Sequence, residues 1–81
     1  MKDDETFKHY LFDLGGLIKE YALAAVAERE KQSDRAAQEF YDGYVQGFHR
    51  GISLMQQQAH AFGIDLKELQ LEGVEPDRDL V

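Results

Sequence analysis

Apolar residues recur at spacings of three and four along two long segments of the chain, which is the pattern of helices with one apolar side. In the first segment these residues are Phe7, Tyr10, Leu11, Leu14, Leu17, Ile18, Tyr21, Ala24 and Ala25. In the second segment they are Ala37, Phe40, Tyr41, Tyr44, Phe48, Ile52, Met55, Ala59 and Phe62. The pattern predicts helices over about residues 5–30 and about residues 34–62.

The polar run EREKQSD between the two segments holds no periodic apolar residue and predicts the turn that joins the helices. Ser33 or Asp34 is suited to cap the start of the second helix. Gly63 is suited to end it, because glycine readily adopts the left-handed conformation of a helix C-terminus. The fold class is therefore all-α, and its main unit is an antiparallel helical hairpin.

The chain after Gly63 is predicted to add a short helix and a tail to the same single domain, residues 1–81. Asp65 and Glu68 have the spacing of a capping box, which favours a short helix over residues 66–71. Residues 72–81 are acidic and contain the single proline, Pro76, at a turn signal. We expect them to form a flexible acidic tail.

Three glycines, Gly43, Gly47 and Gly51, interrupt the second helix at every fourth position. Each costs roughly 1 kcal/mol relative to alanine in a helix interior. A spacing of four keeps them on one side, where another helix can approach closely. A hairpin turning near residues 32 and 33 would pair Gly51 with Leu14 and Gly47 with Ile18.

Gly15 and Gly16 of the first helix would then lie close to the same crossing. An alternative is that this pair breaks the first helix, with Asp13 capping a new one. The apolar spacing continues across the pair, so we predict an unbroken helix. A further alternative, left open by the sequence, is that the glycines of the second helix receive a helix from another subunit.

Both helices carry more apolar surface than a two-helix hairpin can bury. On the first, Phe12, Leu23 and Val26 point away from the main stripe. Soluble monomers rarely keep large exposed apolar patches. We therefore predict a homodimer in which two hairpins form a four-helix bundle; the alternative is a three-helix monomer whose third helix covers the surplus. The residues predicted to pack helices or form an interface are Gly15, Gly16, Gly43, Gly47, Gly51, Phe12, Tyr41, Tyr44 and Phe48.

Composition narrows the classes of partner. Sixteen acidic residues against nine Lys and Arg give a formal charge of -7, which argues against direct nucleic-acid binding, because phosphate contacts need a basic patch. No stretch approaches the ~18 apolar residues of a membrane span. The N-terminal MKDDETFKHY lacks the pattern of a signal peptide, and the chain has no cysteine, so we expect a cytoplasmic protein.

Candidate chemistry is sparse. His9 and Asp13 are four residues apart, but a metal site needs further ligands that the sequence does not supply. His49 and Ser53 could touch as a base and a nucleophile, but nothing identifies an oxyanion hole or an orienting group. Arg50 adjoins Gly51 and could bridge to an acid across an interface. We therefore predict no catalytic residue, no metal and no cofactor.

The functional hypothesis from sequence is a protein–protein interaction or regulatory module that acts as a homodimer, with another protein as a further partner. The four tyrosines support it, because tyrosine suits half-buried interface positions. Two alternatives remain: an acidic mimic of nucleic acid that inhibits a nucleic-acid-binding protein, and a helical bundle that binds a small molecule.

Overall fold

The protein consists of two long antiparallel helices followed by two short helical segments, with no strand among residues 2–81. The computed structural model describes residues 2–81, and their side chains from residue 4 onward. Helix α1 (Lys2–Lys31) turns into α2 (Arg35–Ala61), and the chain continues through the 3-10 helix η1 (Leu66–Leu69) to α3 (Pro76–Asp79). The all-helical class, the hairpin and a short C-terminal helix are confirmed.

Both ends of α2 and the start of η1 are set by residues that the sequence indicated. η1 ends at Leu69 rather than at the predicted residue 71, because Gln70 adopts a left-handed conformation with a φ of 55°. The Asp34 carboxylate accepts a hydrogen bond from the backbone N–H of Ala37 at 3.2 Å, which satisfies one free donor at the start of α2. Gly63 follows α2 with a φ of 70°, a conformation that favours glycine. Asp65 caps η1 by accepting from Lys67 N–H at 2.9 Å.

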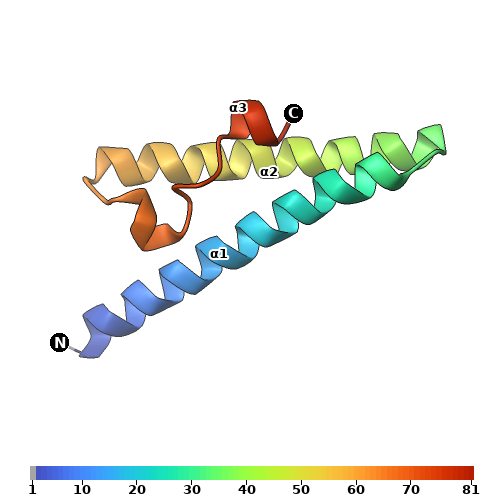
Figure 1. The fold of residues 1–81 in the computed structure, drawn as a ribbon. Helices are drawn as coiled ribbons and strands as arrows, with labels where there is room; N and C mark the ends of the chain where they lie inside the picture. The colour runs from blue at the N-terminus through green and yellow to red at the C-terminus, as the bar shows by residue number, and fades with distance from the viewer. Residues whose placement is uncertain (1) are drawn as a thin grey trace.

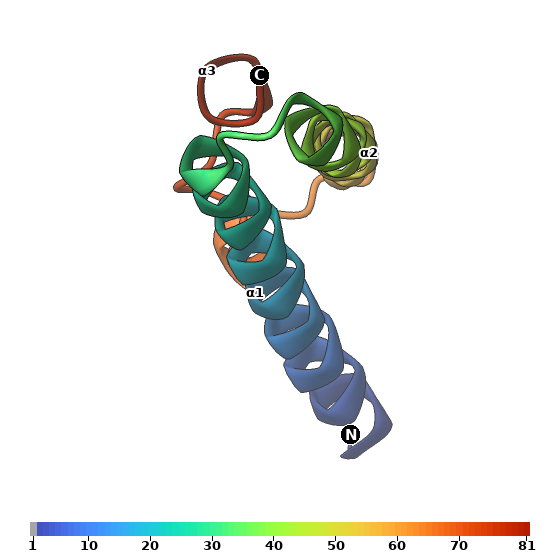
Figure 2. The same ribbon diagram turned by 90° about the vertical axis from the view of Figure 1, so that its right-hand side faces the viewer.

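The hairpin is elongated, with principal extents of 51 × 22 × 16 Å, and its two helices are not parallel throughout. They lie close together near the turn and diverge towards the other end (Figure 1). There the chain after α2 crosses to α1 and packs beside the diverging helices, with η1 against α1. α3 then returns along α2, so the last part of the chain covers one side of the hairpin (Figures 1 and 2).

The core is small, and the C-terminal segment (residues 62–81) supplies much of it. The long helices bury mainly small residues, so their backbones approach closely where the hairpin is narrow. The buried apolar residues are Ala22, Ala25, Val45, Ile52, Ala59, Leu69, Leu71, Val74 and Leu80. Four of these nine follow α2, so the hairpin without the C-terminal segment would lose much of its buried apolar surface.

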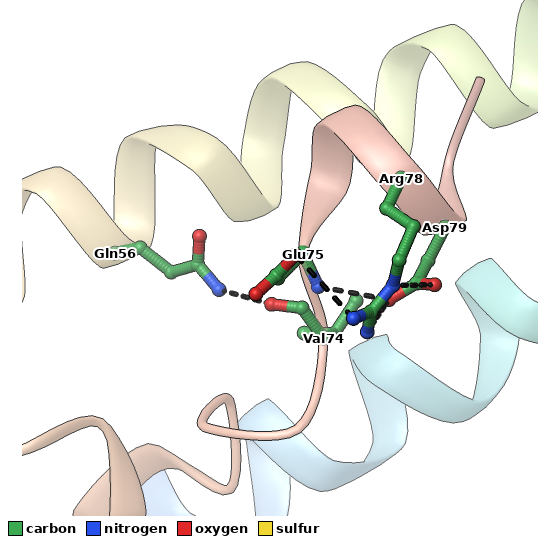
Figure 3. A network of polar contacts seen from close by, with 5 residues as sticks. All are labelled: Gln56, Val74, Glu75, Arg78 and Asp79. Atoms are coloured by element: carbon green, nitrogen blue, oxygen red, sulfur yellow. Dashed lines mark hydrogen bonds and ion pairs between the residues drawn. The ribbon is translucent and has the colours of Figure 1, made fainter.

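The prediction of a flexible tail over residues 72–81 is wrong, because this part of the chain is packed. Val74 and Leu80 are buried, and Pro76 begins α3 at a position where its missing N–H costs nothing. Gln56 of α2 donates to the backbone oxygens of Leu71 at 3.1 Å and Val74 at 2.9 Å, the latter drawn in Figure 3. The acidic composition of residues 72–81 gave no indication that Val74 and Leu80 are buried in the core.

Gly15 and Gly16 lie inside an unbroken α1, as predicted, but their neighbour is η1 rather than α2. A Cβ on Gly15 would overlap the carbonyl oxygen of Leu69 and lie 2.8 Å from its carbonyl carbon. A Cβ on Gly16 would lie 2.5 Å from Nε2 of Gln70, which donates to the Phe12 carbonyl at 2.8 Å. These two glycines therefore make room for the backbone and side chain of the chain after α2.

We expect Gly15→Ala to lower the free energy of unfolding by about 2–3 kcal/mol, because the added methyl meets backbone that cannot rotate away. Gly73→Ala, which lies outside both exposed sets described below, is the matched control: a Cβ there would lie 3.0 Å from Nζ of Lys19, the end of a flexible side chain that can move away, so the free energy of unfolding should change little. Urea unfolding followed by circular dichroism measures both. Equal stability of the two variants would contradict the seating of Leu69 on α1.

Candidate protein-interaction surface

The buried residues of α2 and its three glycines lie on different sides of the helix. Val45, Ile52 and Ala59 are buried and lie seven residues apart, which keeps them on one side. Successive residues are about 100° apart around a helix, so Gly47, two residues after Val45, lies about 200° away from it. The three glycines of α2 therefore lie on the side opposite the core.

This position corrects the predicted pairing of Gly51 with Leu14 and of Gly47 with Ile18. A Cβ built on Gly43, Gly47 or Gly51 meets nothing within 4 Å. The close contact between the helices is instead made where alanines of α1 are buried. The other reading of the glycines, as a groove for a second subunit, stays a prediction.

Four aromatic side chains form a continuous ladder beside the glycines. The ring centroids of Phe40 and Tyr44 are 5.1 Å apart, and those of Tyr44 and Phe48 are 6.5 Å apart. Tyr41 packs edge-on against Phe40, with centroids 5.4 Å apart. Phe40 and Tyr44 are exposed, whereas Tyr41 and Phe48 are half-buried. The ladder holds its rings in fixed mutual contact while two of them face solvent.

We define the aromatic–glycine face as the outward side of α2, made up of Phe40, Gly43, Tyr44, Gly47, Gly51 and Leu54. All six residues are exposed. Phe40, Tyr44 and Phe48 line a shallow groove whose floor is formed by Gly43 and Gly47. The groove exists because glycine leaves the helix backbone bare between the aromatic rings.

A second exposed set, which we name the α1 flank, consists of Tyr10, Leu17 and Tyr21. Their spacings of seven and four place them on one side of α1. The opposite side of α1 holds Gly15 and Gly16, against which the C-terminal segment packs.

The aromatic–glycine face likewise lies on the side of its helix that is opposite the C-terminal segment. Gln56 and His49, which contact that segment, lie on the far side of α2 from Gly47. Both exposed sets therefore lie on the side of the hairpin that the C-terminal segment leaves uncovered. Figure 2 shows η1 and α3 displaced together to one side when the hairpin is viewed from its turn.

The aromatic–glycine face carries no acidic residue, although the chain has a formal charge of -7. The nearest charges on the same side of α2 are Arg50, between Gly47 and Gly51, and Glu39, which is exposed and lies four residues before Gly43. Arg50 makes no ion pair within the part of the chain that the structure describes, unlike Arg29, whose Nη1 lies 3.2 Å from Asp42 Oδ1. A second copy would meet a carboxylate only at the edge of this face, where Glu39 is paired with Arg35 at 3.5 Å.

The other residues of the predicted interface have mixed surroundings. Phe12 is exposed and lines a surface groove with Lys8, His9 and residues of η1.

Leu54 was missed by the sequence analysis, because it falls outside the apolar spacing that places Ile52 and Met55 towards the core. Its position seven residues after Gly47 was the available signal, since that spacing returns to the same side of a helix.

Polar groups of the long helices mostly anchor the C-terminal segment. His49 Nε2 lies 2.9 Å from Asp77 Oδ1, and Arg29 Nη2 donates to the backbone oxygen of Val81 at 2.8 Å. The sequence did not indicate the His49–Asp77 pair, because 28 residues separate its members. No hydrogen bond joins Ser53 to His49 among the described residues, so the geometry assembles no base–nucleophile pair.

Within residues that the structure describes, no three His, Asp or Glu side chains are grouped as metal ligands, His9 and Asp13 included. None of the described helices has the length and continuous apolar character that would let it cross a membrane. What distinguishes the surface is thus its uncovered aromatic and glycine residues.

Besides the contact of Asp77 with His49, α3 and its N-cap hold a local group of charges, Glu75, Arg78 and Asp79 (Figure 3). The Asp79 carboxylate accepts from Arg78 Nε at 2.8 Å and from the backbone N–H of Glu75 at 2.9 Å. These bonds, the one from Arg78 first, lower the pKa of Asp79 from its usual 3.8 to about 2. Arg78 also lies 3.4 Å from Glu75, and its pKa is raised, chiefly by the hydrogen bond to Asp79.

Comparison of the chain with protein-family models, curated proteins and solved structures gives no match. The functional argument therefore rests on the geometry of the uncovered side of the hairpin.

We expect the carboxyl carbon of Asp79 to titrate with a midpoint near 2 in an NMR pH series. Because this pKa is lower in the folded than in the unfolded chain, ionised Asp79 stabilises α3 at pH above about 4. That contribution is lost as the pH falls through about 2. Arg78→Gln removes the largest cause, so the midpoint should rise in this variant. An unchanged midpoint would contradict the assignment.

Proposed function

We propose that the protein is a protein–protein interaction module that acts as a homodimer, and that its interface is formed by the aromatic–glycine face and the α1 flank. The observation that carries the proposal is the ladder from Phe40 to Phe48, half of which is exposed on a side of the hairpin that the rest of the chain does not cover. Two such hairpins, packed through their uncovered sides, would make a four-helix bundle.

The exposed area supports an interface that includes both helices. Phe40, Tyr44 and Leu54 are 59%, 52% and 57% exposed. An aromatic side chain presents roughly 150–250 Å² and a leucine somewhat less, so these three residues together offer about 300 Å² of exposed surface. A stable interface covers about 800 Å² on each partner, so the aromatic–glycine face alone falls short.

The α1 flank makes up most of the difference. Tyr10, Leu17 and Tyr21 are 60%, 47% and 62% exposed and offer about another 300 Å² on the same scale. Bare glycine backbone and the half-buried rings of Tyr41 and Phe48 add to this sum. The uncovered side as a whole therefore approaches the area of a standard interface, which supports packing of hairpin on hairpin.

Charge supports a second copy as the occupant. The protein is acidic, yet the six residues of the aromatic–glycine face include no acid. The carboxylate at the edge of the face, that of Glu39, is paired with Arg35 at 3.5 Å, so two copies can meet at the centre of the face without placing carboxylates against each other. The same surface lacks the basic patch that phosphate binding requires. A symmetric dimer also covers the surplus surface of both partners at once.

Size-exclusion chromatography with light scattering tests the proposal through a matched pair of variants. Leu54→Asp places a buried charge in the interface and should convert the dimer to a monomer, with a rise in the dissociation constant of at least about a hundredfold. Leu23→Asp introduces the same change at an exposed leucine on another side of α1 and should leave the dimer intact.

Circular dichroism of both variants checks that the helices persist. A native protein that is monomeric at ~100 µM would overturn the proposal, because this exceeds the dissociation constants of stable dimers. Dissociation by Leu23→Asp but not by Leu54→Asp would place the interface elsewhere.

A further inference from the structure

We propose that the groove between α1 and η1 binds an acidic peptide segment of another protein, one in which carboxylates adjoin an aromatic or aliphatic side chain. We name it the α1–η1 groove; it is lined by Lys8, His9, Phe12, Lys67 and Glu68. The inference does not depend on the proposed homodimer, because none of these residues belongs to the aromatic–glycine face or the α1 flank.

The groove is formed because η1 is seated on Gly15. α1 continues past η1 towards its N-terminus (Figure 1). Phe12, three residues before Gly15, therefore lies at the edge of the contact between the two helices, and it is 43% exposed. Lys8 lines the groove from α1 and Lys67 lines it from η1, so two segments far apart in the sequence bring their lysines to the same ring.

The surface of the groove is mostly apolar, although four of its five lining residues are polar or charged. The ring of Phe12 and the aliphatic stems of the lysines supply this apolar surface, while the ammonium groups stay in water. The groove is shallow and open, whereas sites for small molecules enclose about 70–90% of their ligand. These properties favour a side chain of a peptide, with a charged group beside it, over a small molecule.

The lysines of the groove are free to pair with a ligand. Among the described residues, neither Lys8 nor Lys67 forms an ion pair through its side chain, whereas four other Lys and Arg residues each pair with an acid. A carboxylate bound beside Phe12 would accept charge-assisted hydrogen bonds from the two ammonium groups without displacing an acid of the chain.

Two acidic residues restrict the class of ligand. Glu68 lines the groove, and Glu5, seven residues before Phe12, lies on the same side of α1. They reduce the positive charge of the groove, which is thus unsuited to a polyanion such as nucleic acid. A peptide supplies carboxylates for the lysines and backbone N–H donors for Glu68. The formal charge of -7 repels such a peptide at long range, but salt screens this repulsion beyond about 8 Å.

The groove stays accessible when the proposed homodimer forms. Phe12 lies five residues before Leu17 of the α1 flank, which places the two side chains about 140° apart around α1. A dimer packed through the α1 flank would therefore present two outward grooves, one on each copy. A partner with two acidic segments could bind both grooves and gain affinity from the second.

Titration of the native protein with synthetic peptides, followed by NMR of the backbone amides, tests the proposal. The probe is acetylated and amidated Glu-Phe-Asp-Leu-Glu, and it should shift the amide signals of Lys8, Phe12 and Lys67 with a dissociation constant on the order of 0.1–1 mM. The matched peptide Gln-Phe-Asn-Leu-Gln should bind at least about tenfold more weakly, because it offers no carboxylate. Glu-Ser-Asp-Ser-Glu should be equally weak, because it leaves the apolar surface of the groove uncovered.

A matched set of variants locates the contact. Lys8→Gln and Lys67→Gln together should weaken the binding of the acidic peptide about tenfold, since each removes an exposed ion pair. Lys31→Gln makes the same change at the other end of α1 and should leave the affinity unchanged. All three lysines are exposed, so circular dichroism should be the same for every variant.

Three results would overturn the inference: no binding of the acidic peptide at about 5 mM, equal binding of the amide peptide, or an equal effect of Lys31→Gln. Tighter binding of a thymidine oligonucleotide to the same residues would assign the groove to phosphate and would also overturn it. Light scattering of the same samples reports the homodimer separately. A dimer that binds no peptide overturns this inference alone, and a monomer that binds the peptide overturns the proposed function alone.

Discussion

The contact between the Leu69 carbonyl and Gly15 is the constraint on which the rest of the structure depends. Only a residue without a side chain lets η1 backbone lie directly against α1 at this point. With η1 in place, Leu69 and Leu71 are buried, and the chain is directed back along α2 towards Leu80. The C-terminal segment thus takes one side of the hairpin and leaves the other uncovered.

Local signals in the sequence were sufficient for the helices and their ends. The apolar spacing located α1 and α2, and Asp34, Gly63 and Asp65 marked termini by chemistry that acts over a few residues. The contacts that complete the core could not be derived in this way. Gln70 reaches Phe12 across 58 residues and His49 reaches Asp77 across 28, and no pattern within one helix encodes such pairs.

The glycines of α2 also show what a local sequence pattern cannot predict. Spacing alone indicated that Gly43, Gly47 and Gly51 share one side of α2, but not which side faces the core. Val45 decides it, because it is buried on the same side as Ile52 and Ala59 and lies about 200° around the helix from Gly47; the predicted apolar positions of the second helix did not include it. The sequence identified most residues of the candidate surface. Their exposure depends on which side of α2 the rest of the chain packs against.

The late position of η1 and α3 in the chain has a consequence for synthesis on the ribosome. Both long helices emerge before Leu69, Leu71, Val74 and Leu80 are available to cover them. A hairpin on which these four residues have not yet packed leaves both of its sides open to water, a condition under which chains aggregate.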